Sequence, residues 1–536
     1  MQKKPIFIAY AVCVVFIINA FSGCIVEDLL FGTSFTLESW EIVDYEGFPA
    51  IYLSFTASNT VYVKTYDISG NNIDEDIVFI DRNTTFLNLA SHQEIVASGP
   101  YTLKVLDNNK KIIFEKSFTF EGPKLSLINY DQYWWQPEIW KEDYVLIGIT
   151  FDVKNNGDTP AYPFSIGFPE IKNAEDGIVL PSVILPGEIK QISCYTYQNN
   201  IDDGLPVNIT IKDRSGNILC NSSFIRNQQN IVSSRQFQWL FDGHQYRLSI
   251  PYIDLLHNYY FDLERTLLDD YALYVFDSFD EEFIDLLVSR LLYGKSFDDD
   301  VDKINFAVSF VQDLDYVSDD ENGEEVEYPR YPIETLYEGN GGGGDCEDKA
   351  ILTASILHNM GYDVALLRLT NHMAVGVNIE KNLSAYDRYV DNYYFLETTT
   401  KYQKLGYIPS EYKDDKNLTV FSLNSRPLIY HYWDNGTISI FSNTFLGDFV
   451  RVKIYVKNIG SASAENVIVN AGFYTETGME FNARSKIINV LESEGVEKIM
   501  LISTIPSEVT TVFKTRVIID GKIVGEQQSA SNFPSN

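Results

Sequence analysis

Three stretches of this chain alternate apolar and polar residues with a period of two, and this pattern constrains the fold more than any other feature. They cover about 32–122, 123–226 and 436–527, and almost no apolar residues in them are at helical spacing. A period of two places successive side chains on opposite faces of a strand, so that one face is buried and the other is solvated. Each stretch ends in two apolar runs joined by Asp, Asn or Gly, which favour a tight turn. We therefore expect three β-sandwiches.

The second and third stretches share a short motif. Residues 153–157 read Val-Lys-Asn-Asn-Gly and are followed by Ala161, whereas 456–460 read Val-Lys-Asn-Ile-Gly and are followed by Ala464 at the same offset. These two copies predict repeats of one unit. The motif resembles that of the adhesion-type, immunoglobulin-like sandwiches of bacterial and archaeal surface proteins, which implies this fold and a position outside the cell.

The N-terminus predicts export. Lys3 and Lys4 precede an apolar run over 5–21, and Ser-Gly-Cys24 follows. This arrangement resembles a lipoprotein signal peptide over 1–23, which implies that Cys24 carries the lipid in the mature protein. An uncleaved anchor is the alternative, although the run is shorter than the roughly 20 residues that span a membrane. Both interpretations place the protein on the extracellular face, with the membrane as a partner.

Length and charge limit the other possibilities. With 536 residues, the chain is long enough for several domains, which we expect over 24–122, 123–226, 228–430 and 436–527. The 75 acidic residues outnumber the 41 basic ones, so the net charge is −34. Nucleic-acid binding is excluded as a function class, because it depends on Lys and Arg at the phosphates.

Two cysteines lie in the second predicted sandwich. Cys194 and Cys220 are on strand-like segments of the same module. In an extracellular setting these two cysteines are a candidate disulfide, and two buried thiols are the alternative.

The region 228–430 has a different pattern. Apolar residues at helical spacing over 281–293 and 301–314 predict two helices, and the acidic run 318–327 predicts a solvated loop. A glycine run at 341–344, expected to be flexible, then leads to Cys346 at the start of a third helix. Because a helix N-terminus stabilises a thiolate and an oxyanion, Cys346 is a candidate nucleophile.

A nucleophilic thiol needs a base, and His372 is the candidate. The run 372–377 alternates so that His372 shares a face with the small Ala374 and Gly376, which leaves room for the helix end and a substrate beside the imidazole. A carboxylate must then orient the imidazole. Glu397, on the next strand-like run, is favoured over Asp387, which lies in the intervening loop.

These residues resemble a known family. Gly-Asp-Cys346-Glu-Asp, Asn-His372-Met-Ala-Val-Gly-Val and Glu397-Thr-Thr together resemble the transglutaminase-like cysteine superfamily over about 330–410. The resemblance implies an α+β, papain-like domain flanked by the all-β sandwiches, with Cys346, His372 and Glu397 as a catalytic triad. The family has Asp where this chain has Glu397.

The resemblance also implies an activity. It indicates a cysteine peptidase, an amidase or an amine transferase that acts on a protein or peptide substrate without a cofactor; calcium is an alternative, since some bacterial relatives use it. The acids Asp345, Glu347 and Asp348 act as helix caps but oppose a thiolate by like charge. The competing hypothesis is a non-catalytic adhesion or scaffold protein that works through its sandwiches.

Overall fold

The structure is a computed structural model that describes residues 32–533 without 81, 139–143, 172–173, 175, 199–200, 202–204, 228–229, 264, 266–270, 278, 320–327, 414, 424–425 and 444–446. The predicted signal peptide 1–23 and Cys24 lie outside the described residues. No helix among the described residues is long and apolar enough to cross a membrane.

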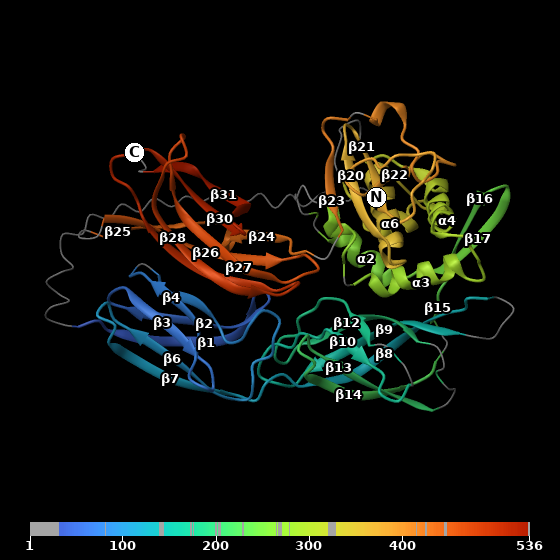
Figure 1. The fold of residues 1–536 in the computed structure, drawn as a ribbon. Coiled ribbons are helices and arrows are strands. Elements are labelled where there is room, and N and C mark those ends of the chain that lie inside the picture. The colour runs from blue at the N-terminus through green and yellow to red at the C-terminus, as the bar shows by residue number, and fades with distance from the viewer. Residues whose placement is uncertain are drawn as a thin grey trace, which may run out of the picture. The chain divides into compact units, whose positions relative to one another are not determined.

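Strands predominate over helices, as expected, and most of them form layered β-sheet modules (Figure 1). The chain divides into two compact units. One contains Ile51–Leu87, Pro100–Phe118 and the segment that ends at Glu41, and the other contains Ile42–Ala50, Asn88–Gly99 and everything from Thr119 onward.

The first sandwich has two sheets. One has the strand order β1–β2–β5 and the other β4–β3–β6–β7. Their bounds are β1 Phe35–Tyr45, β2 Phe48–Ala57, β3 Val61–Tyr66, β4 Asn72–Val78, β5 Thr84–Asn88, β6 Gly99–Leu106 and β7 Ile112–Phe120.

The second sandwich is built from one continuous eight-stranded sheet, in the order β14–β13–β10–β11–β12–β9–β8–β15. Their bounds are β8 Leu125–Trp135, β9 Val145–Asn155, β10 Ser165–Gly167, β11 Gly177–Val179, β12 Ile189–Gln198, β13 Pro206–Lys212, β14 Ile218–Ile225 and β15 Asn230–Ile231. The hairpin expected near residue 213 forms between β13 and β14.

The candidate disulfide of this module is not formed. Cys194 and Cys220 are free thiols and both are buried. Cys194 lies on β12 and Cys220 on β14, which are not neighbours in the strand order. Both side chains belong to the apolar core, and burial raises the pKa of both thiols. The alternative of two buried thiols therefore describes this structure.

The last sandwich begins at Ile429, earlier than the expected residue 436. One sheet contains β24 (Ile429–Trp433), β25 (Ser439–Asn443), β26 (Gly447–Asn458) and β29 (Val496–Thr504). The other has the order β28–β27–β30–β31, with β27 Ala464–Tyr474, β28 Glu480–Leu491, β30 Thr511–Ile519 and β31 Lys522–Phe533.

The repeated motif has one structural role in both modules. The Asn155 amide donates to the carbonyls of Thr159 (2.8 Å) and Ile184 (2.9 Å), while its oxygen accepts from the backbone N–H groups of Lys124 and Gly157. A Cβ on Gly157 would lie 2.2 Å from the Gly122 carbonyl, so this position requires glycine.

Asn458 repeats this network in the last sandwich. Its amide donates to Ala462 (2.8 Å) and Leu491 (3.0 Å), and its oxygen accepts from Leu428 and Gly460. Both asparagines are fully buried. Each one ties the chain entering its module to a central strand.

The region between these sandwiches is mixed. It begins with the hairpin β16 (Ser234–Phe241) and β17 (His244–Pro251), and its helices are α2 (Asp254–Asp262), α3 (Glu281–Leu292), α4 (Asp300–Asp313), α5 (Pro332–Tyr337) and α6 (Cys346–Asn359). A short parallel pair joins β18 (Asp315–Tyr316) to β19 (Gly343–Gly344). The four-stranded antiparallel sheet has the order β22–β21–β20–β23, with β20 Asp363–Leu369, β21 His372–Asn378, β22 Tyr394–Leu396 and β23 Thr419–Ser422.

Helix α6 is the centre of this region. Its residues Ala350–Leu357 are buried, and it packs on β20 and β21 (Figure 1). The predicted helices over 281–293 and 301–314 match α3 and α4 within one residue at each end. This packing fixes the position of the residue at the start of α6.

Candidate active site

Cys346 is the first residue of α6, as predicted, but the glycine run before it is ordered. Gly343 and Gly344 pair with Asp315 and Tyr316 and are buried. Gly342 has φ +76°, and a Cβ on Gly344 would lie 2.4 Å from the Asp348 Cβ. The glycines therefore allow a tight approach of the chain to α6. The expected flexibility was wrong, because backbone pairing holds the run in place.

Acids surround the thiol. The Cys346 Sγ donates a hydrogen bond to the Glu347 Oε2 at 3.2 Å. Burial raises the pKa of Cys346, and Glu347 and Asp345 raise it further, while the backbone N–H of Met373 acts in the opposite direction. The expected like-charge conflict at this thiol is thus present, and the Met373 contact places Cys346 beside the start of β21.

His372 opens β21 and contacts Glu397. The His372 Nε2 lies 3.0 Å from the Glu397 Oε2, and their side chains are 8% and 2% exposed. Burial favours a neutral Glu397, but hydrogen bonds from His372 and Thr399 and the His372 charge outweigh burial and lower its pKa to about 2. Because an ionised carboxylate only accepts, Nε2 carries the proton and Nδ1 is the basic ring nitrogen.

Glu397 is held at both ends. Its Oε1 accepts from the Thr399 hydroxyl at 2.6 Å and the Thr399 backbone N–H at 2.8 Å. Strand β22 ends at Leu396, so Glu397 stands just beyond the sheet. The longer side chain at this position thus reaches His372 from outside the strand ladder. Asp387 lies exposed in the loop between β21 and β22.

The predicted alternation of faces on β21 is present, but helix α6 covers the opposite face from the one expected. Met373, Val375 and Val377 share the large core cluster with α6, whereas Ala374 packs with Tyr393 and Phe395. A Cβ on Gly376 would lie 3.0 Å from the Tyr393 Cβ, so the small residues accommodate aromatic rings and not the helix end. His372, the first residue of the strand, has a side chain that is only 8% exposed, with the Tyr412 ring stacked on its face.

Helix α4 connects the segment after β22, which carries Glu397, to helix α6, which carries Cys346. The Gln312 amide, near its C-terminus, donates to the carbonyls of Glu397 (2.8 Å) and Gln403 (2.9 Å). Lys349 of α6 donates to the Leu314 carbonyl at 2.9 Å. Gln312 and Lys349 are 2% and 1% exposed. Burial, together with Lys401, lowers the pKa of Lys349 to about 8.

A cluster of three carboxylate side chains lies beside the Cys346 thiol. Oxygens of Asp319, Asp345 and Glu347 lie within 4.8 Å of one another. Burial raises the pKa of Asp345 to about 8, with Glu347 as the next cause. Asp319 is the first acid of the run predicted to be solvated, yet its side chain is only 8% exposed and bonds Arg330 at 2.7 Å, while residues 320–327 of that run lie outside the described residues. Arg330 also pairs with the fully buried Asp348.

Sequence reasoning missed several of these residues. Asp319, Arg330, Gln312 and Tyr412 all take part in the site, and they are distant along the chain from the motif around Cys346. The only available signal was that Arg330 is a single basic residue among many acids.

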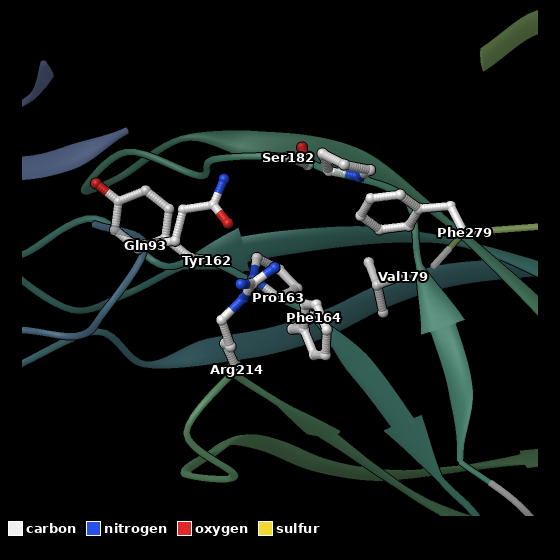
Figure 2. A pocket seen from close by; sticks show the side chains of 9 residues that line it. Gln93, Tyr162, Pro163, Phe164, Val179, Ser182, Arg214 and Phe279 are labelled. Carbon is white, nitrogen blue, oxygen red and sulfur yellow. The ribbon is translucent and has the colours of Figure 1, made fainter. Parts of the chain in front are cut away.

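A small pocket elsewhere in the larger unit has a different character (Figure 2). Tyr162, Pro163, Phe164 and Phe279 line it, and Arg214 is its only charged residue. The Arg214 guanidinium lies over the Phe164 ring at 5.0 Å. This lining contains no thiol, carboxylate or imidazole, so it supplies no nucleophile or base.

Comparisons with known proteins give little support. No protein-family model and no curated protein matches the sequence. Among solved structures, two fibronectin type III domains of chicken tenascin match with 12% identity, covering 36% of this chain and 99% of that one at a TM-score of 0.17. Red sea bream transglutaminase matches with 8% identity. The match covers 72% of this chain and 80% of that one, at a TM-score of 0.16. The exo-chitosanase CsxA of Amycolatopsis orientalis matches with 9% identity, covering 90% and 76% at 0.15. Such low scores carry no argument about function.

Proposed function

We propose that this protein is an exported thiol acyl-transfer enzyme of the transglutaminase-like type, with a papain-like α+β domain over 228–430. Cys346 is the nucleophile, His372 is the base, and Glu397 orients His372. The substrate is a peptide or side-chain amide of a protein. The single observation that carries the proposal is the buried contact of 3.0 Å between His372 and Glu397 at the start of β21, next to the helix that begins with Cys346.

The reaction has two steps. The Cys346 proton moves to the His372 Nδ1, the sulfur bonds the carbonyl carbon, and the amide C–N bond breaks as His372 returns the proton to the leaving amine. Water or an amine then attacks the thioester and releases Cys346. Water as acceptor gives a peptidase or amidase, which we favour, and an amine acceptor gives a transferase. The α6 N-terminus points its N–H groups toward the charge that develops.

No cofactor enters this reaction. The oxygens of Asp319, Asp345 and Glu347 nevertheless fit calcium, which takes oxygen ligands at carboxylates. These three residues would hold the ion, and its charge would offset the acids that oppose a thiolate. Calcium is therefore included as a variable in the tests of activity.

The proposed location is the extracellular face of the membrane, with lipid on Cys24. Cysteine-specific lipidation is checked by mass spectrometry of the N-terminal peptide. An unmodified chain that retains residues 1–23 would favour the uncleaved anchor.

The test of activity uses casein and a fluorescent amine, with and without calcium. We expect fragments from hydrolysis, or labelled casein from transfer. Cys346→Ser and His372→Ala should abolish the product, and Glu397→Gln should reduce it by about 10²- to 10⁴-fold, since the imidazole loses its orientation. Cys220→Ser is the matched control, because this thiol is buried in another module.

The competing function is adhesion through the sandwiches. The repeated motif favours it, because both copies build the same network in modules without catalytic groups. Absence of turnover under every condition, or full turnover by Cys346→Ser, would reject the enzyme and leave this function.

A further inference from the structure

A tyrosine ring lies flat against the base of the proposed triad. The rings of His372 and Tyr412 have centroids 4.8 Å apart and are inclined by only 10°. Tyr412 ends the short 3-10 helix Ser410–Tyr412, forty residues beyond the histidine. A parallel aromatic face at this distance is attractive for a cation and for a flat ring.

The ring is held in place independently of the histidine. The Tyr412 ring also stacks on the Phe395 ring of the same domain, with the ring centroids 6.3 Å apart and an interplanar angle of 24°. Phe395 is fully buried on β22. The Tyr412 carbonyl accepts a hydrogen bond from the Tyr389 hydroxyl at 2.6 Å. This second anchor uses the backbone, so it survives replacement of the side chain.

The groups that face the imidazole come from three elements. Glu397 contacts Nε2 from the end of β22, Cys346 and Glu347 lie at the start of α6, and Tyr412 covers a ring face. Burial raises the pKa of Tyr412, followed by the charges of Glu397, Glu411 and Cys346. The phenol therefore lies close to both the thiol and the carboxylate, and it stays neutral.

We propose that Tyr412 is a positioning residue that fixes the plane of the His372 ring and so holds its Nε2 on Glu397. The inference rests on the proposed function, since it acts only through His372. A ring held in this plane keeps Nδ1 in place to accept the thiol proton. The aromatic cover also shields the contact between His372 and Glu397 from water, which strengthens it.

The test measures iodoacetamide alkylation of Cys346 between pH 5 and 10, resolved by peptide mass spectrometry. Tyr412→Leu should slow alkylation about two- to fivefold near pH 7, in line with the usual strength of an aromatic ring contact, because an imidazole that is no longer held in its plane is a poorer base. Tyr412→Phe should match the wild type. Tyr293→Leu, which removes an exposed ring of the same domain, is the matched control.

A double mutant separates positioning from a general structural role. In a His372→Ala background, Tyr412→Leu should have no further effect, because the residue that transmits it is gone. If Tyr412→Leu fails to fold by circular dichroism, Tyr412→Gln replaces it. A normal profile for the folded variant, or an equal effect with and without His372, overturns the inference. If His372→Ala alone leaves alkylation unchanged, the proposed function itself fails.

Discussion

At the scale of single residues, the thiol and its acidic neighbours decide the behaviour of the site. Cys346 donates to Glu347, and burial together with this carboxylate raises the thiol pKa. The sequence predicted the conflict, since the acids flank Cys346 directly. It did not predict Arg330 or Tyr412, which approach from distant segments and can be placed only by the tertiary fold.

Removing the acid that bonds the thiol should make Cys346 more reactive. Glu347→Gln removes a charge that raises the thiol pKa. The thiolate fraction at pH 7 should therefore increase by up to about tenfold for each unit by which the thiol pKa falls. Alkylation rates measure this fraction, and Glu380→Gln, at an exposed site, is the control. Unchanged or slower alkylation would contradict the role assigned to Glu347.

Asp345 should make stability depend on pH. Its pKa of about 8 in the folded protein lies above the ordinary 3.8, so the folded state favours the protonated carboxyl. The contribution of Asp345 to the free energy of unfolding is therefore fully present below pH 3.8 and is lost as the pH rises through 8. Asp345→Asn should therefore stabilise the mixed domain more at pH 8 than at pH 5. Urea unfolding at both values checks this, with the exposed Asp387→Asn as control. An equal effect at both values would count against a raised pKa.

At the scale of elements, α4 holds α6 and the turn after β22 in one arrangement. Gln312 supports the backbone of Glu397, and Lys349 ties α6 to the end of α4. Helices α3 and α4 were predictable from periodicity, because it reports the buried face of a helix, whereas the shorter α2 and α5 were not predicted. The orientation of β21 was not predictable, since alternation defines two faces without stating which one a helix covers.

Loss of the Gln312 amide should loosen this arrangement. Gln312→Ala leaves the buried carbonyls of Glu397 and Gln403 without this donor, so the free energy of unfolding should fall by about 1–3 kcal/mol. Denaturant unfolding measures the loss. Gln245→Ala, which removes an exposed amide, should change the free energy of unfolding by no more than about 0.5 kcal/mol.

At the scale of the whole molecule, the chain repeats one device. Asn155 and Asn458 make the same four hydrogen bonds in different sandwiches, and each is followed by a glycine against the incoming chain. The sequence predicted the repetition from five shared positions, but not its cause, because most of the hydrogen-bond partners lie outside the motif.

Each asparagine should stabilise only its own module. Asn155→Ala and Asn458→Ala leave two buried carbonyls and two N–H groups without these partners, which should cost about 2–4 kcal/mol. Calorimetry should show one transition move while the others stay. Asn156→Ala, at an exposed position, is the control. A shift of every transition together would mean that the modules unfold as one.

The asparagine clamps also determine how the chain responds to tension. In a protein pulled at its two ends, force enters each of these two sandwiches through the segment that the asparagine grips at Lys124 or Leu428. The load therefore falls on the hydrogen bonds that the asparagine makes where the chain enters the module. The strand that follows begins at the next residue, Leu125 or Ile429, and pairs there with the asparagine itself, so its first ladder pair shares this load.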